Sequence, residues 1–163
     1  MTSKTYAGGS QALARQLSYE EVAQPKPSDT RTGVLWMVVP YTTPELTRAA
    51  LRHAGVCSDL DVHVVLVDIQ IVPFPCSLDH PPVDPKFSRR RLTELLKETQ
   101  LPGRAAVVYT RDWLEGFKRV LEPGSLVILA TKKRWWPTRE AKLARALMKA
   151  GHQVMLLRVA QAR

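Results

Sequence analysis

A group of cationic and aromatic side chains follows the apolar run SLVILA and precedes a segment with a helical pattern. The group consists of Lys132, Lys133, Arg134, Trp135 and Trp136. The helix expected to begin near Thr138 would direct its free N–H groups and positive partial charge toward the same place. Together with charge-assisted hydrogen bonds from the cations, this helix end could hold a phosphate, a sulfate or a carboxylate.

The same group has other interpretations. The cations could form a solvated surface while the two indoles pack over the adjoining helix or over a partner chain. An exposed indole would instead offer a stacking platform for nucleobases. Four further cations fall within about 120° of one face of the helix after Thr138, which is either an ordinary solvated face or a nucleic-acid surface. They are Arg139, Lys142, Arg145 and Lys149. The opposite, apolar face of this helix is expected to consist of Leu143, Ala144, Leu147 and Met148. A third basic cluster, residues 89–91, could contact phosphate.

Residue types suited to catalysis or metal binding are sparse. Cys57 and Cys76 have no CxxC motif and no histidine at ligand spacing, so the sequence predicts neither a zinc site nor a disulfide. Asp68 is expected at the end of a strand, and Asp112, three residues before Glu115, has the position of a helix cap. We therefore expect no catalytic residues, no metal and no enzymatic activity.

Apolar runs alternating with helical patterns must position these side chains. Five short runs rich in Val, Ile and Leu predict strands that are covered on both faces, as in a parallel sheet. The runs are GVLWMVV, VHVVLVD, RAAVVYT, SLVILA and VMLLRV. Helical patterns between the runs predict four helices, the first capped by Thr42 or Thr43 and the second beginning after Pro85. This succession predicts a doubly wound α/β domain, in which ligands lie beyond the carboxyl ends of the strands.

Composition limits the kind of protein. With 163 residues, of which 45% are hydrophobic, the chain can bury one core, and its net charge of +9 favours anionic partners. Residues 1–32 have a linker-like composition, so we predict a flexible tail followed by an α/β domain at residues 33–163. No apolar run approaches the roughly 20 residues of a membrane span, and no signal peptide is evident, so we expect a cytoplasmic protein.

Over residues 33–159 the chain resembles the universal stress protein family. The resemblance is carried by VVPYTTPELTRAALRHA as first strand and helix, VHVVLVD as second strand and PGSLVILA as the approach to the fourth. It implies a three-layer sandwich around a five-stranded parallel sheet in the order 3-2-1-4-5, with four helices. It also implies that the loops after strands one and four are neighbours and that a homodimer forms through the fifth strand.

The resemblance further implies that the family's ATP site is degenerate in this chain. Many members bind ATP through a Gly-x2-Gly-x9-Gly-Ser/Thr loop, whose glycines let backbone N–H groups approach the phosphates. The first two glycine positions fall on Ala130 and Lys133, and an aspartate used on the nucleoside side falls on Thr42. We expect no ATP cofactor, and a site for an anionic small molecule or an altered nucleotide instead. Its candidate residues are Pro40, Tyr41, Thr42, Asp68, Ala130, Thr131, Lys132, Lys133, Arg134 and Thr138.

Three functions are compatible with these features. The first is a non-enzymatic regulatory or stress-response domain of the universal stress type. The alternative is a basic nucleic-acid-binding module that uses the KKRWW loop and the cationic stripe of the last helix. The third is an enzyme related to adenine-nucleotide hydrolases, which the missing phosphate loop disfavours.

Overall fold

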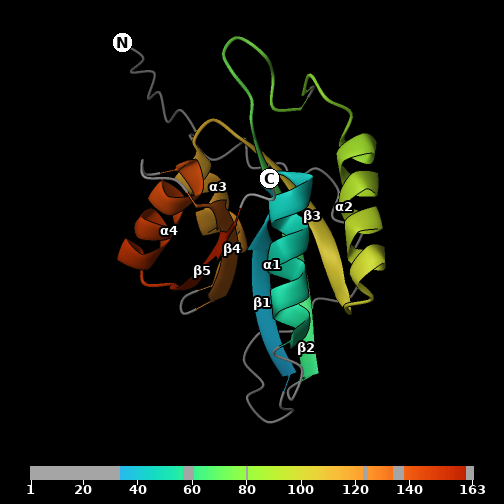
Figure 1. Ribbon diagram of the computed structural model, residues 1–163. Coiled ribbons are helices and arrows are strands. Elements are labelled where there is room, and N and C mark those ends of the chain that lie inside the picture. Colours follow the sequence, from blue (N-terminus) through green and yellow to red (C-terminus); the bar gives the residue numbers. More distant parts are fainter. Residues whose placement is uncertain (1–33, 57–60, 80, 123–124, 134–137, 161–163) are drawn as a thin grey trace, which may run out of the picture.

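The computed structural model describes residues 34–56, 61–79, 81–122, 125–133 and 138–160, in which five strands alternate with four helices (Figure 1). The strands are β1 (Val34–Pro40), β2 (Asp61–Ile71), β3 (Gly103–Thr110), β4 (Leu126–Lys132) and β5 (Gln153–Val159). The helices are α1 (Pro44–Val56), α2 (Pro85–Thr99), α3 (Trp113–Val120) and α4 (Arg139–Lys149). The predicted tail, residues 1–32, and the domain boundary at residue 33 lie outside the described residues.

The five strands form one parallel sheet in the order β3-β2-β1-β4-β5, which confirms the predicted fold class. From β1 the chain moves outward to β2 and β3, then returns to β4 on the other side of β1. The strand order therefore reverses between β1 and β4, and this is where open sheets of this kind place ligands.

Each face of the sheet carries its own hydrophobic core. Helices α1 and α2 cover one face, and α3 and α4 cover the other, which gives three layers (Figure 1). Along β2, Val64 and Leu66 pack under the first pair of helices, whereas Val65 and Val67 pack under the second. Because alternate residues of a strand point to opposite faces, burial of both faces requires the near-continuous apolar runs seen in the sequence.

Side-chain caps begin the helices close to where the sequence predicts them. Thr43 rather than Thr42 caps α1, since its Oγ1 accepts a hydrogen bond from the N–H of Leu46 at 3.3 Å. The predicted cap of α3 is confirmed, because Asp112 accepts from the N–H of Glu115 at 2.9 Å. Thr138 caps α4 by accepting from the N–H of Ala141 at 3.2 Å. Each cap satisfies one N–H group that the first helical turn would otherwise leave free.

Two details differ from the sequence prediction. Strand β2 continues to Ile71, so Asp68 lies inside the strand and not at its end. Its partner strand β3 remains paired with β2 up to Ile71 and Thr110, which keeps this part of the chain extended. Met148, expected on the apolar face of α4, is 51% exposed.

No helix in the described part of the chain has the length and apolar character needed to cross a membrane.

Candidate functional site

The loops after β1 and β4 leave neighbouring strands at the same edge of the sheet. Pro40 is the buried last residue of β1 and pairs with Val67 of β2. Strand β4 pairs with β1 near its own beginning, at Leu126 and Val127, and its later residues continue to pair with β5 as far as Lys132. The last residues of β4 therefore pair with β5 and not with β1. The carboxyl end of β4 lies on the side of the strand-order reversal that is nearer to β5.

Backbone groups of the loop after β1 are bound within the protein. The N–H of Tyr41 donates to the carbonyl of Val67 at 2.7 Å, and the N–H of Thr42 donates to Oγ1 of the buried Thr47 at 3.3 Å. Both N–H groups point at atoms of the fold and not into open space. Neither is free to bind a ligand in this conformation.

A hydroxyl pair joins the end of β4 to the start of α4. Oγ1 of Thr131 lies 2.6 Å from Oγ1 of Thr138, which is the same oxygen that caps the helix. Ala130 and Thr131 are buried, so their side chains serve the core and this hydroxyl pair. Lys132 is half-buried and Lys133 is exposed, and the N–H of Lys133 donates to the carbonyl of Val159 at 3.1 Å.

The structure describes two of the five residues of the KKRWW group, Lys132 and Lys133. Arg134, Trp135 and Trp136 lie outside the described residues, so their participation stays a prediction. Of the predicted cationic cluster, the structure thus places Lys132 and Lys133 at the carboxyl end of β4, seven residues or fewer before the start of α4. Both lysines lie where a ligand of an open α/β sheet would bind.

A second polar cluster lies on the β2 side of the reversal point, where the sequence prediction had only Asp68. The side chain of Asp68 is 10% exposed and accepts hydrogen bonds from Nη2 of Arg91 at 3.1 Å and from Nε2 of Gln70 at 2.8 Å. The same Gln70 amide nitrogen lies 2.8 Å from Oγ of the buried Ser88. The guanidinium carbon of Arg91 lies 4.4 Å from the centroid of the Tyr41 ring, a cation–π contact.

Arg91 thus links α2, β2 and the loop after β1. Its Nη2 donates a hydrogen bond to Asp68, and its guanidinium group lies over the ring of Tyr41. Its Nε is buried and has no hydrogen-bond partner among the described residues. No hydrogen bond or ion pair of the described residues connects this cluster to the Thr131–Thr138 pair, so the predicted site residues fall into two groups.

The basic clusters found in the sequence have different surroundings. Within residues 89–91, Arg91 turns inward, whereas Arg89 and Arg90 are exposed and Arg90 pairs with Glu94 at 3.0 Å. All four cations of the predicted α4 stripe are exposed. The guanidinium of Arg139 lies 4.5 Å from the ring centroid of Trp113, so this member of the stripe also packs on α3.

Sequence reasoning missed one further arginine. Arg111, which follows β3, donates from Nη1 to the carbonyls of Val72 and Pro73 and from Nη2 to the carbonyl of Cys76. It fixes the first part of the loop of residues 72–84, which connects β2 to α2. Among the described residues, no group of three or more His, Cys, Asp or Glu side chains has the arrangement of a metal site.

No model of a known protein family matches the chain, and no curated protein matches its sequence. Solved structures do match it. A universal stress protein from Archaeoglobus fulgidus aligns with a TM-score of 0.55 and 13% identity, over 75% of this chain and 92% of that chain.

Two other matches have lower TM-scores. A universal stress protein in complex with cAMP gives 0.47 at 12% identity, over 78% of this chain and 98% of that chain. A protein of the universal stress protein family from Burkholderia pseudomallei gives a TM-score of 0.46 at 15% identity, over 78% of this chain and 97% of that chain. At such identities the Archaeoglobus match is informative about the fold alone, and the chain has the α/β fold of a universal stress protein.

Proposed function

We propose that this chain is a cytoplasmic, non-enzymatic regulatory domain of the universal stress type, whose crevice binds an anionic small molecule and not ATP. The observation that carries the proposal is the position of Arg91, bonded to Asp68 and stacked on Tyr41 beside the loop after β1. A guanidinium in this place covers a face of the Tyr41 ring on which a nucleobase could otherwise stack, and it neutralises the carboxylate of Asp68.

The opposite side of the crevice favours an anion. Lys132 and Lys133 end β4, and the N-terminus of α4 begins at the Thr138 cap. Cations and a helix N-terminus both stabilise negative charge, by roughly 0.3 to 1 kcal/mol for the helix end alone. A small anion needs no space beside Tyr41, so the position of Arg91 does not oppose its binding.

Isothermal titration with ATP and with pyrophosphate tests both halves of the proposal. If only the phosphates are recognised, ATP should bind no more tightly than pyrophosphate, and incubation with ATP should release no phosphate. The variant Lys132→Glu with Lys133→Glu should lose pyrophosphate binding. The matched variant Lys142→Glu with Lys149→Glu, which changes the net charge equally at the exposed face of α4, should retain it.

Three results would overturn the proposal. A micromolar or tighter dissociation constant for ATP, well below that for pyrophosphate, would show that the nucleoside is recognised despite Arg91. Equal affinity of the wild type and both lysine variants for pyrophosphate would show that the end of β4 is an ordinary solvated surface. Binding of neither ligand would remove the anion site.

A nucleic-acid-binding module is the second candidate, favoured by the exposure of all four stripe residues on α4. Such binding releases counterions, so its affinity would fall steeply and linearly with salt on logarithmic axes. A small anion in the crevice would depend far less on salt. Under this second function, Lys142→Glu with Lys149→Glu would weaken binding of single-stranded DNA, and the pyrophosphate titration would be unaffected.

We also propose that the domain forms a homodimer through β5. This strand is the last of the sheet, and its side chains at Met155, Leu156 and Leu157 are only half-buried in the single chain. An unprotected edge with apolar side chains tends to pair with another strand. A second copy of β5 would cover it.

A further inference from the structure

Large apolar side chains are exposed mainly at one end of the molecule. Six are exposed in the described part of the chain, and four of them lie at the carboxyl end of the sheet near β2 and α2. These four are Ile71, Phe74, Val83 and Phe87. Phe74 is 83% exposed and Phe87 is 63% exposed. One solvent-exposed aromatic ring therefore lies near each end of the loop of residues 72–84. We call these four residues the apolar tip.

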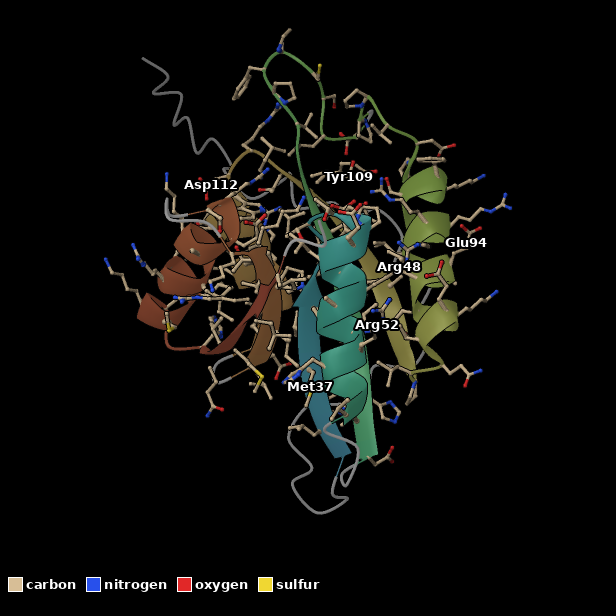
Figure 2. All side chains as sticks on the ribbon, viewed as in Figure 1. Met37, Arg48, Arg52, Glu94, Tyr109 and Asp112 are labelled. Atoms are coloured by element: carbon tan, nitrogen blue, oxygen red, sulfur yellow. The ribbon has the colours of Figure 1, made fainter. Side chains whose placement is uncertain are left out.

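The loop of residues 72–84, which carries Phe74 and Val83, extends beyond the ends of the strands and above the N-terminus of α2 (Figure 1). Three hydrogen bonds from Arg111, of 2.6 to 2.8 Å, hold its first half. The guanidinium of Arg111 also lies 4.1 Å from the ring centroid of Phe74. In the second half, the hydroxyl of Tyr109 donates to the carbonyl of Val83 at 3.3 Å, and Figure 2 shows Tyr109 at the foot of the loop.

These contacts hold the loop in place while Phe74 remains exposed. The pKa of Tyr109 is raised by burial, so its hydroxyl stays a proton donor to the loop throughout the physiological range. Because the loop is anchored by Tyr109 of β3 and by Arg111 directly after it, docking would order little of the loop and would cost little conformational entropy. The exposed ring is therefore a preformed contact.

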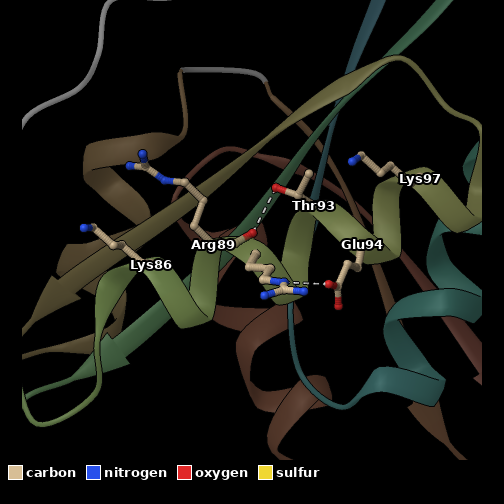
Figure 3. Close-up of a pocket in the computed structure, with 6 residues that line it drawn as sticks. Lys86, Arg89, Thr93, Glu94 and Lys97 are labelled. Atoms are coloured by element: carbon tan, nitrogen blue, oxygen red, sulfur yellow. Dashed lines mark hydrogen bonds and ion pairs between the residues drawn. The ribbon is translucent and has the colours of Figure 1, made fainter.

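Cations adjoin the tip on α2. Lys86, Arg89 and Arg90 are exposed and are spaced to lie on one face of the first two helical turns. They line a shallow hollow together with Thr93, Glu94 and Lys97 (Figure 3). Glu94 pairs with Arg90, whereas Lys86 and Arg89 have no acidic partner within the described part of the chain. Cations near a helix N-terminus gain nothing from the helix dipole, so helix stability does not explain their position.

We propose that this end of the protein docks on an anionic lipid surface. Phe74 and Phe87 would enter the boundary between headgroups and acyl chains, while Lys86 and Arg89 contact headgroup phosphates. A protruding apolar tip next to unpaired cations suits a flat, deformable, negatively charged surface. Single-stranded nucleic acid fits less well, because two of the four tip residues are aliphatic and the guanidinium of Arg111 already covers one face of the Phe74 ring. The net charge of +9 favours approach to such a surface.

Co-sedimentation with vesicles tests the role of the aromatic rings. The wild-type chain should bind mixed vesicles of phosphatidylcholine and phosphatidylglycerol, and should bind pure phosphatidylcholine much more weakly. Phe74→Ala with Phe87→Ala should weaken binding to the mixed vesicles by about tenfold or more, with unchanged circular dichroism. The control is Val56→Ala with Met148→Ala, which removes exposed apolar side chains from α1 and α4 and should bind as the wild type does.

A pair of charge variants separates location from total charge. Lys86→Glu with Arg89→Glu should weaken vesicle binding by about tenfold or more, since each cation near an anionic membrane contributes about 1 kcal/mol. Lys142→Glu with Arg145→Glu changes the net charge by the same amount on α4 and should retain most of the binding. This pair alters no residue of the loop, so it tests the proposal even if the alanine variant fails to fold.

Three outcomes would overturn the proposal. The wild type could fail to bind the mixed vesicles, or the two charge variants could lose equal affinity, which would indicate unspecific attraction. Alternatively, Lys86→Glu with Arg89→Glu could abolish binding of single-stranded DNA and leave vesicle binding intact. That result would assign the cations of α2 to nucleic acid.

Discussion

Arg91 donates from Nη2 to Oδ2 of Asp68 at 3.1 Å, so a cation on α2 neutralises a carboxylate inside β2. The pair lies beside Tyr41, whose ring stacks under the same guanidinium. Three segments distant in sequence therefore meet at one side chain, next to the point where the strand order reverses. Oδ2 of this carboxylate is consequently occupied by the fold itself.

Removing this cation should destabilise the protein. In Arg91→Leu the carboxylate of Asp68 stays largely buried and keeps only the amide of Gln70 as partner, which should lower the free energy of unfolding by about 2 kcal/mol. Chemical denaturation measures this. Arg90→Leu is the control, because the Arg90–Glu94 pair is exposed on both sides and contributes less than about 0.5 kcal/mol. Equal losses in the two variants would contradict a structural role for Arg91.

The sequence indicated the fold more completely than the site. Doubly buried strands such as β2 must be apolar on both faces, so the five runs predicted five strands and their parallel arrangement. The cap at Asp112 and the helix start near Thr138 were predictable because capping depends on neighbours three residues away. These features are local in the chain, and the structure confirms them.

The Arg91 cluster depends on contacts between distant segments and was not predicted. Three consecutive arginines at the start of a helix look alike in the sequence, and which of them turns inward depends on how α2 lies over β2. A signal was nevertheless present. Asp68 and Gln70, two residues apart in an apolar strand, share one face of the sheet and require polar partners there. Arg111 offers no comparable signal, since its partners are backbone carbonyls of a loop.

An ion pair between α1 and α2 should make stability depend on pH in acid. Nε of Arg48 lies 2.7 Å from Oε2 of Glu98, and this hydrogen bond lowers the pKa of Glu98. A lowered pKa in the folded state means that the pair stabilises the protein above the unfolded pKa of about 4.3, and that this stabilisation disappears as the pH falls through the folded value.

Unfolding of the wild type and of Glu98→Gln across a pH series checks this. The wild type should be the more stable near neutral pH, and the difference should shrink toward zero in acid. Arg48→Gln removes the other partner of the ion pair and should lose the same pH-dependent part of the free energy of unfolding. A difference between wild type and Glu98→Gln that does not change with pH would contradict the ion pair as its cause.

Two helical glycines should respond oppositely to alanine. A Cβ atom at Gly116 of α3 would lie 2.7 Å from Cγ2 of Ile69 and 2.9 Å from Cγ2 of Thr110, closer than van der Waals contact allows. These are branched methyl groups of buried strand residues that cannot move aside easily, so Gly116→Ala should lower the free energy of unfolding by about 1–3 kcal/mol.

Gly55 of α1 provides the matched control. Its Cβ would meet Leu101 at an ordinary 3.5 Å, so Gly55→Ala should stabilise the protein by about 0.5–1 kcal/mol through helix propensity. Thermal unfolding of both variants measures the two effects. If Gly116→Ala is as stable as the wild type, α3 does not pack as closely on β2 and β3 as the structure has it.

The proposed dimer depends on which backbone groups of β5 face outward. The N–H of Gln153 donates to Ser125 and the carbonyl of Val159 accepts from Lys133, so odd-numbered residues of β5 bond to β4. In a parallel ladder the bonding direction alternates, which directs the N–H of Leu156 to the open edge and that of Leu157 into the sheet. Proline at these two neighbouring positions should therefore have different effects.

Leu156→Pro removes a donor from the open edge and should convert the dimer to a folded monomer, because proline is tolerated where no ladder bond is lost. Leu157→Pro should break the pairing of β4 with β5 and unfold the protein. Leu156→Ala keeps the N–H and controls for the lost side chain, so it should remain dimeric. Light scattering on a sizing column should give the wild type a mass near twice 18.3 kDa. A monomeric wild type at high micromolar concentration, or a dimeric Leu156→Pro, would show that β5 is not the interface.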